Sequence, residues 1–361
     1  MKDRTSTPFR RAIWLLLLLP LLLTACAGAR APSTSWPGLA VQDGVAYVAF
    51  NQAIYAVDVE NGREQWRYLP GEDQATSFFA QPAVDSDAGI VYAGSFDGDV
   101  VALEQDTGNV IWNHRLTGAR IIGGPALAGD LLLVPSANRQ LYALRTDSGQ
   151  EVWTFRSERA FWSTPRVEGE FVYLAGLDHV LYKLALEDGS IVWERDLSGA
   201  LADEPASFNG LLLVGTFGEQ LNAVDKETSE VAWSVETGDW VWGNPVVFED
   251  TAFFGDVSGR FYAVNRQGTP IWEFNVEGQV AASPAAADGF VYLVTEDGSI
   301  YARAAEDSTP EWEQNLEGRL LTDPVVIEET LLVAAIDGDN LLTAFDINSG
   351  AIRWTYQPVE E

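Results

Sequence analysis

Eight copies of one short phrase, each ending in tryptophan, restrict the possible folds of this chain more than any other feature. In the copy ALRTDSGQEVW, alanine stands ten residues and glycine four residues before Trp153. Successive copies end 39 to 46 residues apart, a period that fits propeller blades and also some helical repeats. The copies end at Trp66, Trp112, Trp153, Trp193, Trp233, Trp272, Trp312 and Trp354.

The residues between the tryptophans favour strands over helices. Runs such as GVAYVAF, FVYLAG and LLLVGTF are rich in β-branched and aromatic residues and are bounded by Gly, Asp and Asn. No repeat contains ten or more residues with helical periodicity. The run Leu211–Val214 is apolar at every position, so both of its faces must be covered, as in a ring of packed sheets. The sequence therefore predicts an all-β fold, a single eight-bladed β-propeller over residues 36–357 with four antiparallel strands per blade.

The repeated phrase has a physical explanation within such a blade. The alanine leaves room beside the third strand, and the glycine permits the positive φ of a tight turn. The tryptophan then docks on the adjoining blade, where burial of its ring contributes on the order of 3 kcal/mol. Ser229 and Ser308 replace the glycine in two copies, which predicts looser turns there, and Lys183 replaces the alanine in another.

The N-terminus has the features of an export signal rather than of a folded element. A basic segment precedes the apolar run IWLLLLLPLLL, which is too short and too interrupted by proline for a membrane span. The run leads into LTAC, which ends at Cys26, the only cysteine, and resembles the bacterial lipobox. The resemblance implies a signal peptide over residues 1–25, a lipid on the Cys26 thiol and a flexible tether over residues 26–35. An ordinary secretory signal is the alternative.

The chain is strongly acidic, and its charge is unevenly distributed. The formal net charge is −31, and residues 168–361 carry 36 acidic but only 8 basic side chains. Such a field repels nucleic acid and anionic lipid headgroups, so no nucleic-acid partner is expected. A cationic partner, or solubility in a salty environment, fits the acidity. One cysteine and two histidines are too few for an internal disulfide or for a cysteine-rich or three-histidine metal site.

The pattern Ala-x-Asp-x-x-x-Gly-x-x-x-Trp resembles the tryptophan-docking motif of the pyrroloquinoline-quinone-type (PQQ-like) β-propeller repeat family. One class of this family is the quinoprotein dehydrogenases, and membership there implies a quinone on the propeller axis, a Ca²⁺ ion and an Asp general base. Another class consists of lipid-anchored, non-catalytic propellers of the bacterial envelope. It includes the propeller lipoprotein of the outer-membrane β-barrel assembly machinery, which this chain resembles in length, lipobox and blade number.

Several sequence features argue against the dehydrogenase class. The disulfide between adjacent cysteines that many of those enzymes carry beside the quinone cannot form in a chain with one cysteine. No loop is long enough to roof a buried cofactor, and no set of oxygen ligands for Ca²⁺ is clustered in the sequence. The DGD fragments at residues 97–99 and 337–339 look like parts of calcium loops, but such positions favour hairpin turns, and Asp-Gly predicts turns of two residues. We therefore expect no cofactor, no metal and no catalysis.

The function that these features favour is a binding platform in the cell envelope. We expect a monomeric propeller outside the cytoplasm, anchored by lipid to an outer membrane facing the periplasm or to the outer face of a single membrane. Its expected partners are envelope proteins or extended clients. A substrate-binding or sensing lipoprotein for a small polar or cationic ligand is the alternative, and a PQQ-dependent dehydrogenase is a more distant one.

The segments that lead into the first strand of each blade contain the candidate binding residues. A polar residue stands directly before the proline that opens most of these strands, and in two segments a tryptophan stands two residues earlier. Side chains two apart on a strand point the same way, so, if that way is inward, a polar ring with aromatic residues above it surrounds the channel. The predicted ligand or peptide site comprises Trp162, Trp240 and Trp242, the polar Glu204, Asn244 and Asp323, and Arg120 and Arg319 at the rim. The alternative is that the tryptophans fill gaps between blades.

Overall fold

The structure is a computed structural model that describes residues 36–71 and 76–359. The predicted signal peptide, Cys26 and the tether of residues 26–35 lie outside the described residues. In the described part of the chain, the regular secondary structure consists of β-strands alone. No helix there has the length and the apolar composition needed to cross a membrane.

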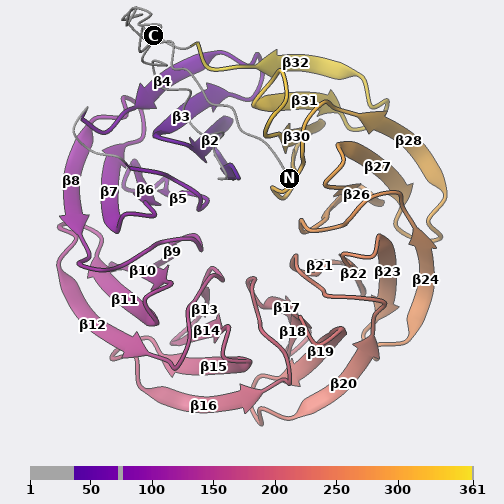
Figure 1. Cartoon of the computed structure of the whole chain (residues 1–361), viewed down its shortest axis with the longest axis horizontal. Helices are drawn as coiled ribbons and strands as arrows, with labels where there is room; N and C mark the ends of the chain where they lie inside the picture. The colour runs from indigo at the N-terminus through magenta and orange to yellow at the C-terminus, as the bar shows by residue number, and fades with distance from the viewer. Residues whose placement is uncertain (1–35, 72–75, 360–361) are drawn as a thin grey trace, which may run out of the picture. The chain divides into compact units, whose positions relative to one another are not determined.

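The strands form eight four-stranded antiparallel sheets, each made of four consecutive strands and arranged as blades around one axis (Figure 1). This arrangement confirms the predicted eight-bladed all-β propeller. The first four blades contain β1 (Gly38–Gln42), β2 (Val45–Phe50), β3 (Ala53–Asp58), β4 (Glu64–Tyr68), β5 (Ala83–Asp85), β6 (Ile90–Gly94), β7 (Asp99–Glu104), β8 (Val110–Arg115), β9 (Ala126–Ala128), β10 (Leu131–Ser136), β11 (Gln140–Arg145), β12 (Glu151–Arg156), β13 (Arg166–Glu168), β14 (Phe171–Ala175), β15 (Val180–Ala185) and β16 (Ile191–Asp196). The other four contain β17 (Ala206–Phe208), β18 (Leu211–Thr216), β19 (Gln220–Asp225), β20 (Val231–Glu236), β21 (Val246–Phe248), β22 (Thr251–Gly255), β23 (Arg260–Asn265), β24 (Pro270–Asn275), β25 (Ala285–Ala287), β26 (Phe290–Val294), β27 (Ser299–Ala304), β28 (Pro310–Asn315), β29 (Val325–Ile327), β30 (Thr330–Ala334), β31 (Leu342–Asp346) and β32 (Ile352–Tyr356).

The hydrophobic core lies between the blades. Each of eight clusters of buried side chains combines residues from two neighbouring blades. Strand β18 shows why its apolar run does not alternate. Leu212 packs in the cluster shared with the fourth blade, and Leu213 packs in the cluster shared with the sixth. The predicted coverage of both strand faces is confirmed.

Each repeated tryptophan joins its blade to the next blade along the ring. The indole Nε1–H donates a hydrogen bond of 2.8 to 3.0 Å to a backbone carbonyl oxygen between the third and fourth strands of that blade. Because a shielded indole N–H needs a partner, the bond orients the ring as well as satisfying the donor. The pairs are Trp66 with Gln105, Trp112 with Thr146, Trp153 with Leu186, Trp193 with Lys226, Trp233 with Arg266, Trp272 with Ala305, Trp312 with Ile347 and Trp354 with Val59.

The glycine of the repeated phrase is required by the tryptophan of the preceding blade. Gly108 has a φ of +70°, and a Cβ added to it would lie 2.5 Å from the ring of Trp66. The glycine therefore supplies both the positive φ expected from the sequence and the space for the docked indole. Ser229 and Ser308 also adopt a φ of +61°, so both turns keep the left-handed backbone despite the substitution.

The Asp-Gly turns are longer than the sequence predicted. Four residues separate β6 from β7, and Gly98 N–H donates to the carbonyl oxygen of Ser95 at 3.0 Å. The hydroxyl of Ser95 also accepts a hydrogen bond from Asp99 N–H at 3.0 Å. The prediction of two-residue turns was wrong because it ignored this serine, whose side chain stabilises the longer turn.

The ring closes by packing between the first and last blades, and each of these blades uses its own four strands. Thr322 Oγ1 donates to the carbonyl oxygen of Pro37 at 2.6 Å, close to the axis. Towards the outside, the Tyr356 hydroxyl donates to the Glu64 carboxylate. The first and last blades are therefore joined by side chains rather than by strands of both within one sheet.

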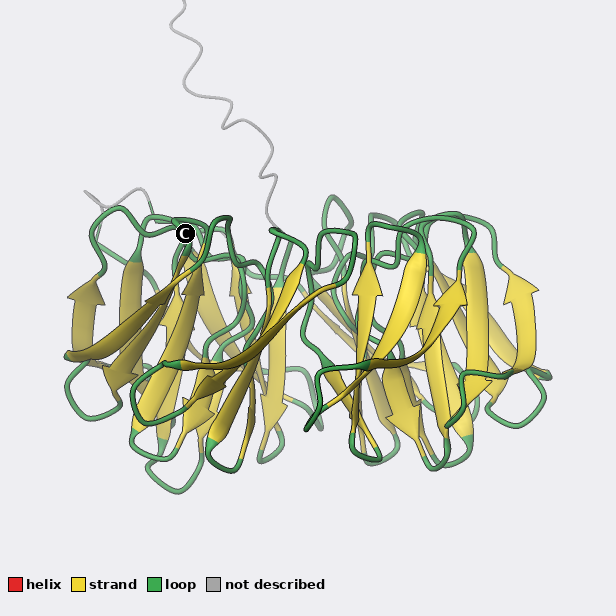
Figure 2. Ribbon diagram, turned by 90° about the horizontal axis from the view of Figure 1, so that it is seen from below, coloured by secondary structure: helices red, strands yellow, loops and turns green. Residues whose placement is uncertain are grey.

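Two kinds of loop meet on one face of the ring, which we call the junction face. They are the loops between consecutive blades, such as residues 116–125, and the turns between the second and third strands, such as residues 137–139. Backbone bonds connect them: Ala137 N–H donates to the carbonyl oxygen of Arg120 at 2.8 Å. The remaining turns form the opposite face, which we call the hairpin face, and Figure 2 shows the loops at both ends of the strands.

Candidate functional site

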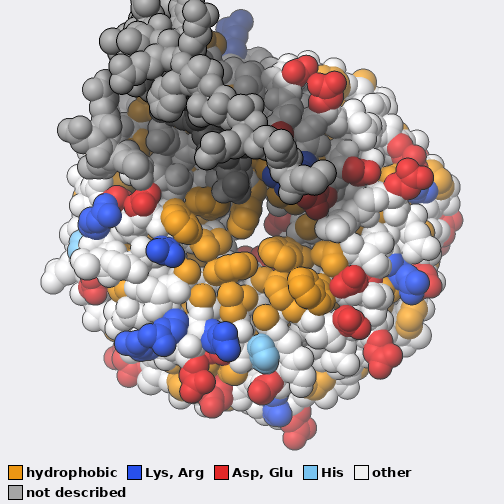
Figure 3. All heavy atoms as spheres, in the orientation of Figure 1, with side chains coloured by type: hydrophobic (Ala, Val, Ile, Leu, Met, Phe, Trp, Pro, Cys, Tyr) orange, Lys and Arg blue, Asp and Glu red, His pale blue; other side chains and the backbone are white. Residues whose placement is uncertain are grey.

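A cavity of about 770 Å³ lies on the axis of the ring at the junction face. All eight blades contribute to its lining through the segments that lead into their first strands. In Figure 3, hydrophobic side chains surround the central opening on this face. A concave site with apolar walls and a few polar groups is the usual form of a binding pocket.

Six of the eight predicted site residues line this cavity: Trp162, Glu204, Trp240, Trp242, Asn244 and Asp323. The residues before the opening prolines therefore point into the channel. Arg120 and Arg319 lie outside the lining. The guanidinium of Arg120 packs 5.5 Å from the ring centroid of Phe96. That of Arg319 pairs with Glu296 at 3.3 Å and with Asp337 at 3.4 Å.

Aromatic side chains form two walls of the cavity. Phe217, between β18 and β19, stacks on Trp240 with ring centroids 4.9 Å apart, and its centroid lies 5.0 Å from that of Trp242. Across the axis, Trp36 and Phe79 meet edge to face at 5.5 Å. Trp240 is 43% exposed, so its ring is available to a ligand instead of being enclosed between blades.

Two aspartates on the cavity wall are linked through Ser283. Asn244 N–H donates to Asp203 Oδ2 at 3.0 Å, and Ser283 Oγ donates to the same oxygen at 3.4 Å. Ser283 N–H donates to Asp323 Oδ1 at 2.6 Å. Segments that lead into four consecutive blades thus meet to hold two carboxylates beside the channel.

This environment disfavours ionised carboxylates. Burial, followed by the charge of Asp323, raises the pKa of Asp203 far above its usual range, and burial raises the pKa of Asp323. Burial also raises the pKa of Glu204 to about 7, although Arg166 opposes the rise. A positive charge placed in the cavity would favour the ionised form of all three carboxylates.

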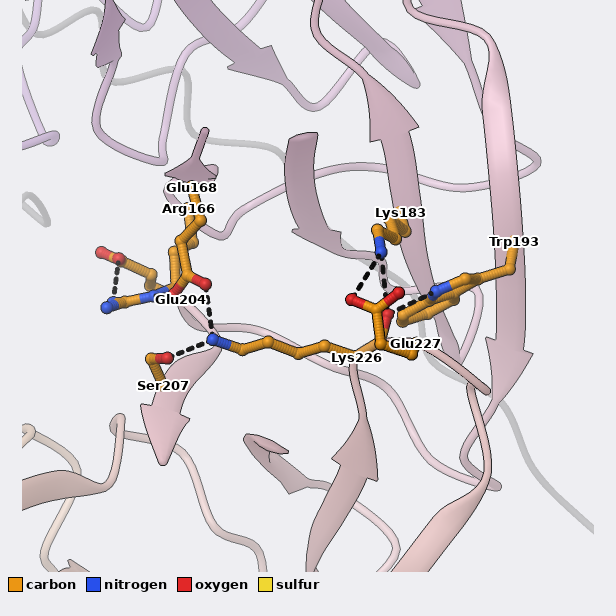
Figure 4. A network of polar contacts seen from close by, with 8 residues as sticks. All are labelled: Arg166, Glu168, Lys183, Trp193, Glu204, Ser207, Lys226 and Glu227. Carbon is orange, nitrogen blue, oxygen red and sulfur yellow. Dashed lines mark hydrogen bonds and ion pairs between the residues drawn. The ribbon is translucent and has the colours of Figure 1, made fainter. Parts of the chain in front are cut away.

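An ion-pair chain leads from Glu204 outward through the ring wall (Figure 4). Arg166 contacts Glu204 at 3.2 Å and Glu168 at 2.7 Å, and Lys226 Nζ contacts Glu168 at 2.5 Å. Burial opposes the ionisation of Glu168, but hydrogen bonds from Lys226 and Arg166 outweigh it and lower the pKa of Glu168 to about 2. The network holds Arg166 in place and so positions one carboxylate of the cavity.

Lys183, which replaces the alanine of the repeated phrase, is accommodated beside this network (Figure 4). Its side chain is 3% exposed, and Nζ donates to the carbonyl oxygen of Lys226 at 2.9 Å. Trp193 Nε1 donates to the same oxygen at 3.0 Å. The ammonium also lies 4.1 Å from the ring centroid of Phe171. With a carbonyl acceptor and an aromatic face, the buried ammonium is satisfied, and the docking of Trp193 is preserved.

A smaller cavity of about 220 Å³ shares Glu204, Asn244 and Asp323 with the larger one. Its other lining residues include the opening prolines and the first strands that follow them, such as Pro205 and Val246. The three shared side chains therefore lie between the two cavities.

The larger cavity does not fit a quinone cofactor with calcium. Of the described residues that line it, none is Lys, Arg or His, and the acidic ones are Asp203, Glu204, Asp239, Glu296 and Asp323. Pyrroloquinoline quinone is a polycarboxylate, so its burial here would bring like charges together with no Lys, Arg or His in the described lining to pair with its carboxylates. Within residues 36–71 and 76–359, no group of three or more His, Cys, Asp or Glu side chains is arranged to hold a metal ion.

Four exposed arginines gather on the junction face, mainly over the third blade, and we call them the arginine surface: Arg120, Arg139, Arg156 and Arg159. Backbone hydrogen bonds place their loops side by side. The carbonyl oxygen of Arg139 accepts from Ser157 N–H, and that of Arg120 accepts from Ala137 N–H. Among the residues that the structure describes, no ion pair involves any of the four. In Figure 3, Lys and Arg side chains gather over the blades of β9–β16, and Asp and Glu side chains predominate across the ring.

Sequence reasoning missed several residues of the cavity and its walls: Trp36, Phe79, Asp203 and Phe217. Phe79 stands three residues before its proline, as Trp162 and Trp242 do, so that offset could have identified it. The segment ALADEP carries two adjacent acids before its proline, which was a signal for Asp203. Phe217 has no such signal, because only its packing against Trp240 brings it to the site.

A protein-family model covers the chain from residue 27 to its end. The PQQ_2 model, described as outer membrane protein assembly factor BamB, matches residues 27–122, 97–203, 178–267 and 257–361. The matches overlap and follow one another, as expected when a model of several blades is placed repeatedly along a propeller.

Assembly factors and quinoprotein dehydrogenases are among the proteins that share sequence with the chain. Outer membrane protein assembly factor BamB of Burkholderia pseudomallei is 23% identical over 326 residues, which cover 74% of this chain and 83% of that protein. A quinoprotein ethanol dehydrogenase of Pseudomonas putida is 30% identical over 158 residues, which cover 38% of this chain and 24% of the enzyme. The chain therefore spans about a quarter of the dehydrogenases that it matches.

Solved structures of both kinds share the fold. BamB from Moraxella catarrhalis superposes with a TM-score of 0.72 at 18% identity, over 89% of this chain and 95% of that one. The quinohemoprotein alcohol dehydrogenase ADHIIG of Pseudomonas putida HK5 gives a TM-score of 0.71 at 14% identity, over 90% of this chain and 75% of that one. At these identities the likeness shows the propeller architecture alone.

Proposed function

The chain belongs to the PQQ_2 family, described as outer membrane protein assembly factor BamB, and from this membership we propose that it is a non-catalytic scaffold of the bacterial envelope. Its match to an assembly factor covers most of both proteins, whereas its match to a dehydrogenase covers about a quarter of the enzyme. The acidic lining of the axial cavity also argues against the cofactor on which the dehydrogenases depend. The propeller acts by docking a protein partner on its junction face.

The arginine surface is the observation that carries this proposal. In a chain with a formal net charge of −31, Arg120, Arg139, Arg156 and Arg159 are exposed together and take no part in the described ion pairs. Arginine is enriched at protein interfaces, and its guanidinium binds carboxylates through two parallel hydrogen bonds. An acidic segment of a partner is attracted to this surface and repelled by most of the remaining molecule, which fixes where it docks.

A lipid anchor would hold this platform at a membrane. The proposed anchor is the thiol of Cys26, followed by the tether of residues 26–35. It places the propeller outside the cytoplasm, either on the periplasmic side of an outer membrane or on the outer side of a single membrane. Partners that are themselves envelope proteins, or clients on their way into the envelope, then meet the junction face without a search in three dimensions.

Site-specific photocrosslinking in cells that make the full-length chain tests the proposal. A photoreactive amino acid replaces Arg139 on the junction face or, as the matched control in the same blade, Ser148 on the hairpin face. We expect one defined adduct from position 139 and none from position 148. The adduct should disappear with the charge reversals Arg120→Glu and Arg159→Glu.

A second control separates docking from net charge. Arg145→Glu lowers the charge by the same amount per site but lies towards the hairpin face, where Arg145 pairs with Asp130 at 3.1 Å. It should leave the adduct intact. An adduct that forms equally from position 148, or that survives reversal of both junction-face arginines, would contradict the proposal.

A further inference from the structure

The axial cavity has a chemistry opposite to that needed for the quinone of its dehydrogenase relatives. We propose that it binds an organic cation, an ammonium or guanidinium group on an apolar stem, between the aromatic walls of Trp240 and Trp242 and the carboxylates of Asp203, Glu204 and Asp323. At about 770 Å³, the cavity has room for a small amine or for a few side chains of an inserted peptide. This site is separate from the arginine surface, which lies outside the cavity lining.

The charge of the lining selects a cation. Its five acidic side chains have no Lys, Arg or His among the described lining residues to balance them. Two arginines reach the wall from outside. Arg166 contacts only Glu204 among the cavity carboxylates and is shared with Glu168, and Arg319 contacts only Glu296 among them and is shared with Asp337. A ligand that brings its own positive charge removes this imbalance, whereas an anion would increase it.

Free acceptor oxygens remain in the cavity. Asp203 already accepts hydrogen bonds from Glu204 N–H, Asn244 N–H and Ser283. Glu204 Oε2 and Asp323 Oδ2, in contrast, accept no hydrogen bond from any described residue. Both oxygens lie on side chains that line the cavity, where an ammonium or guanidinium could donate to them.

The aromatic walls suit an organic cation better than a bare metal ion. Trp240 and Trp242 are both packed against Phe217 and line the same cavity as the carboxylates, and Trp162 lines it from another blade. Indole faces attract cations and also cover apolar stems, and this attraction is stronger where the contact is desolvated. A metal ion would instead require several converging oxygens, and the described residues supply no such group.

Three probes of nearly equal shape test the charge preference by isothermal titration of the detergent-solubilised full-length protein. Phenethylamine carries an ammonium, 2-phenylethanol is neutral, and phenylacetate is an anion. We expect saturable binding of the amine, affinity lower by about tenfold or more for the alcohol, and no binding of phenylacetate. Equal affinity for the amine and the alcohol would overturn the proposal.

Variants identify the cavity as the site. Asp203→Asn combined with Asp323→Asn removes two carboxylates without removing volume, so the amine should lose about tenfold or more in affinity while the alcohol is unaffected. Glu236→Gln, an exposed carboxylate on the same face outside the lining, is the matched control and should bind the amine like the parent protein. Urea unfolding monitors the fold of each variant. Parent-like amine binding by the folded double variant would overturn the proposal.

A further experiment with peptides distinguishes a basic segment of a protein from a small amine as the source of the cation. A capped tripeptide Leu-Lys-Leu is compared with the same peptide carrying norleucine in place of lysine. Tighter binding of the lysine peptide than of phenethylamine indicates that a basic segment of a protein is captured. Tighter binding of phenethylamine indicates a small amine. Failure of every cationic probe would reject the cavity proposal but leave the photocrosslink from the arginine surface, and hence the scaffold function, untouched.

Discussion

The indole Nε1–H of Trp354 donates a hydrogen bond of 2.8 Å to the carbonyl oxygen of Val59, although the two residues are 295 positions apart in the chain. The bond repeats, at the junction of the last and first blades, the contact that every other repeated tryptophan makes with the next blade in sequence. Together with the hydrogen bond from Thr322 to Pro37 close to the axis, it forms part of the seam that closes the ring. The same tryptophan contact thus joins each pair of consecutive blades and also joins the last blade to the first.

Removal of the seam bond should destabilise the whole propeller. Trp354→Phe leaves the Val59 carbonyl without its donor, and we expect a loss of about 1 kcal/mol in the free energy of unfolding in urea. Trp112→Phe removes the equivalent bond to Thr146 between blades that are continuous in sequence. The two variants should lose similar stability. A loss with Trp112→Phe and none with Trp354→Phe would mean that the ring is open at its ends.

The stability cost of a Cβ beneath the docked indole can be measured separately from the cost of backbone strain. Gly62 has a φ of +71°, and an added Cβ would lie 2.6 Å from the ring of Trp354. Gly44 has a φ of +75° but nothing within 4 Å of an added Cβ. We expect Gly44→Ala to cost about 1 kcal/mol of stability through strain alone and Gly62→Ala to cost about 1–3 kcal/mol more through overpacking. Equal costs in chemical denaturation would show that the indole tolerates a Cβ.

The cavity carboxylates should make stability depend on pH with a definite sign. Burial raises the pKa of Glu204 to about 7, and burial with the charge of Asp323 raises that of Asp203. A carboxyl whose pKa is raised by folding binds its proton more tightly in the folded state, so stability falls as the pH rises from about 4 towards the raised pKa. Arg166 opposes this effect at Glu204 but does not cancel it.

Asp203→Asn, which mimics the protonated carboxyl, should therefore match the parent near pH 4 and exceed its stability by on the order of 1 kcal/mol at pH 8. Urea unfolding at several pH values measures this difference. Asp87→Asn, an exposed carboxylate outside the cavity, should retain the pH profile of the parent. A destabilised Asp203→Asn variant at pH 8 would show that the ionised carboxylate is needed for the fold.

The lipid anchor is tested at its only possible thiol. Cys26→Ala should leave the protein in the soluble fraction after cell lysis, whereas the parent chain should sediment with membranes and partition into detergent. Mass spectrometry of the parent N-terminus should detect a lipid-modified Cys26 as the first residue. A Cys26→Ala protein that remains membrane-bound, or an unmodified parent thiol, would refute the anchor.

The repeat made the architecture predictable because its information is local. Each copy places one tryptophan and one glycine at fixed offsets, so blade number, strand content and covered strand faces followed without coordinates. The residues directly before the opening prolines were predictable for the same reason, and Glu204, Asn244 and Asp323 line the cavity together. The length of the Asp-Gly turns was mispredicted because Ser95 contributes through its side chain, which the two-residue pattern does not include.

The arginine surface and the chemistry of the cavity were less accessible to sequence reasoning. Arg120, Arg139 and Arg159 come from three different loops, and only backbone bonds between those loops bring them side by side. Overall composition hid them, since the chain as a whole is acidic. Phe217 is likewise recruited to the site by packing in three dimensions, without a marker in its own repeat.

Hydrogen exchange of the indole N–H groups tests the closed ring most directly, and the axial cavity depends on that ring because every blade contributes to its lining. In nitrogen-15-labelled protein, Trp→Phe substitutions assign the signals of Trp354, Trp112 and Trp240. The Trp354 indole should exchange as slowly as that of Trp112 and on the order of a hundredfold more slowly than that of the exposed Trp240. If the Trp354 indole exchanges as fast as that of Trp240, the seam is open and the closed propeller described for this chain is wrong.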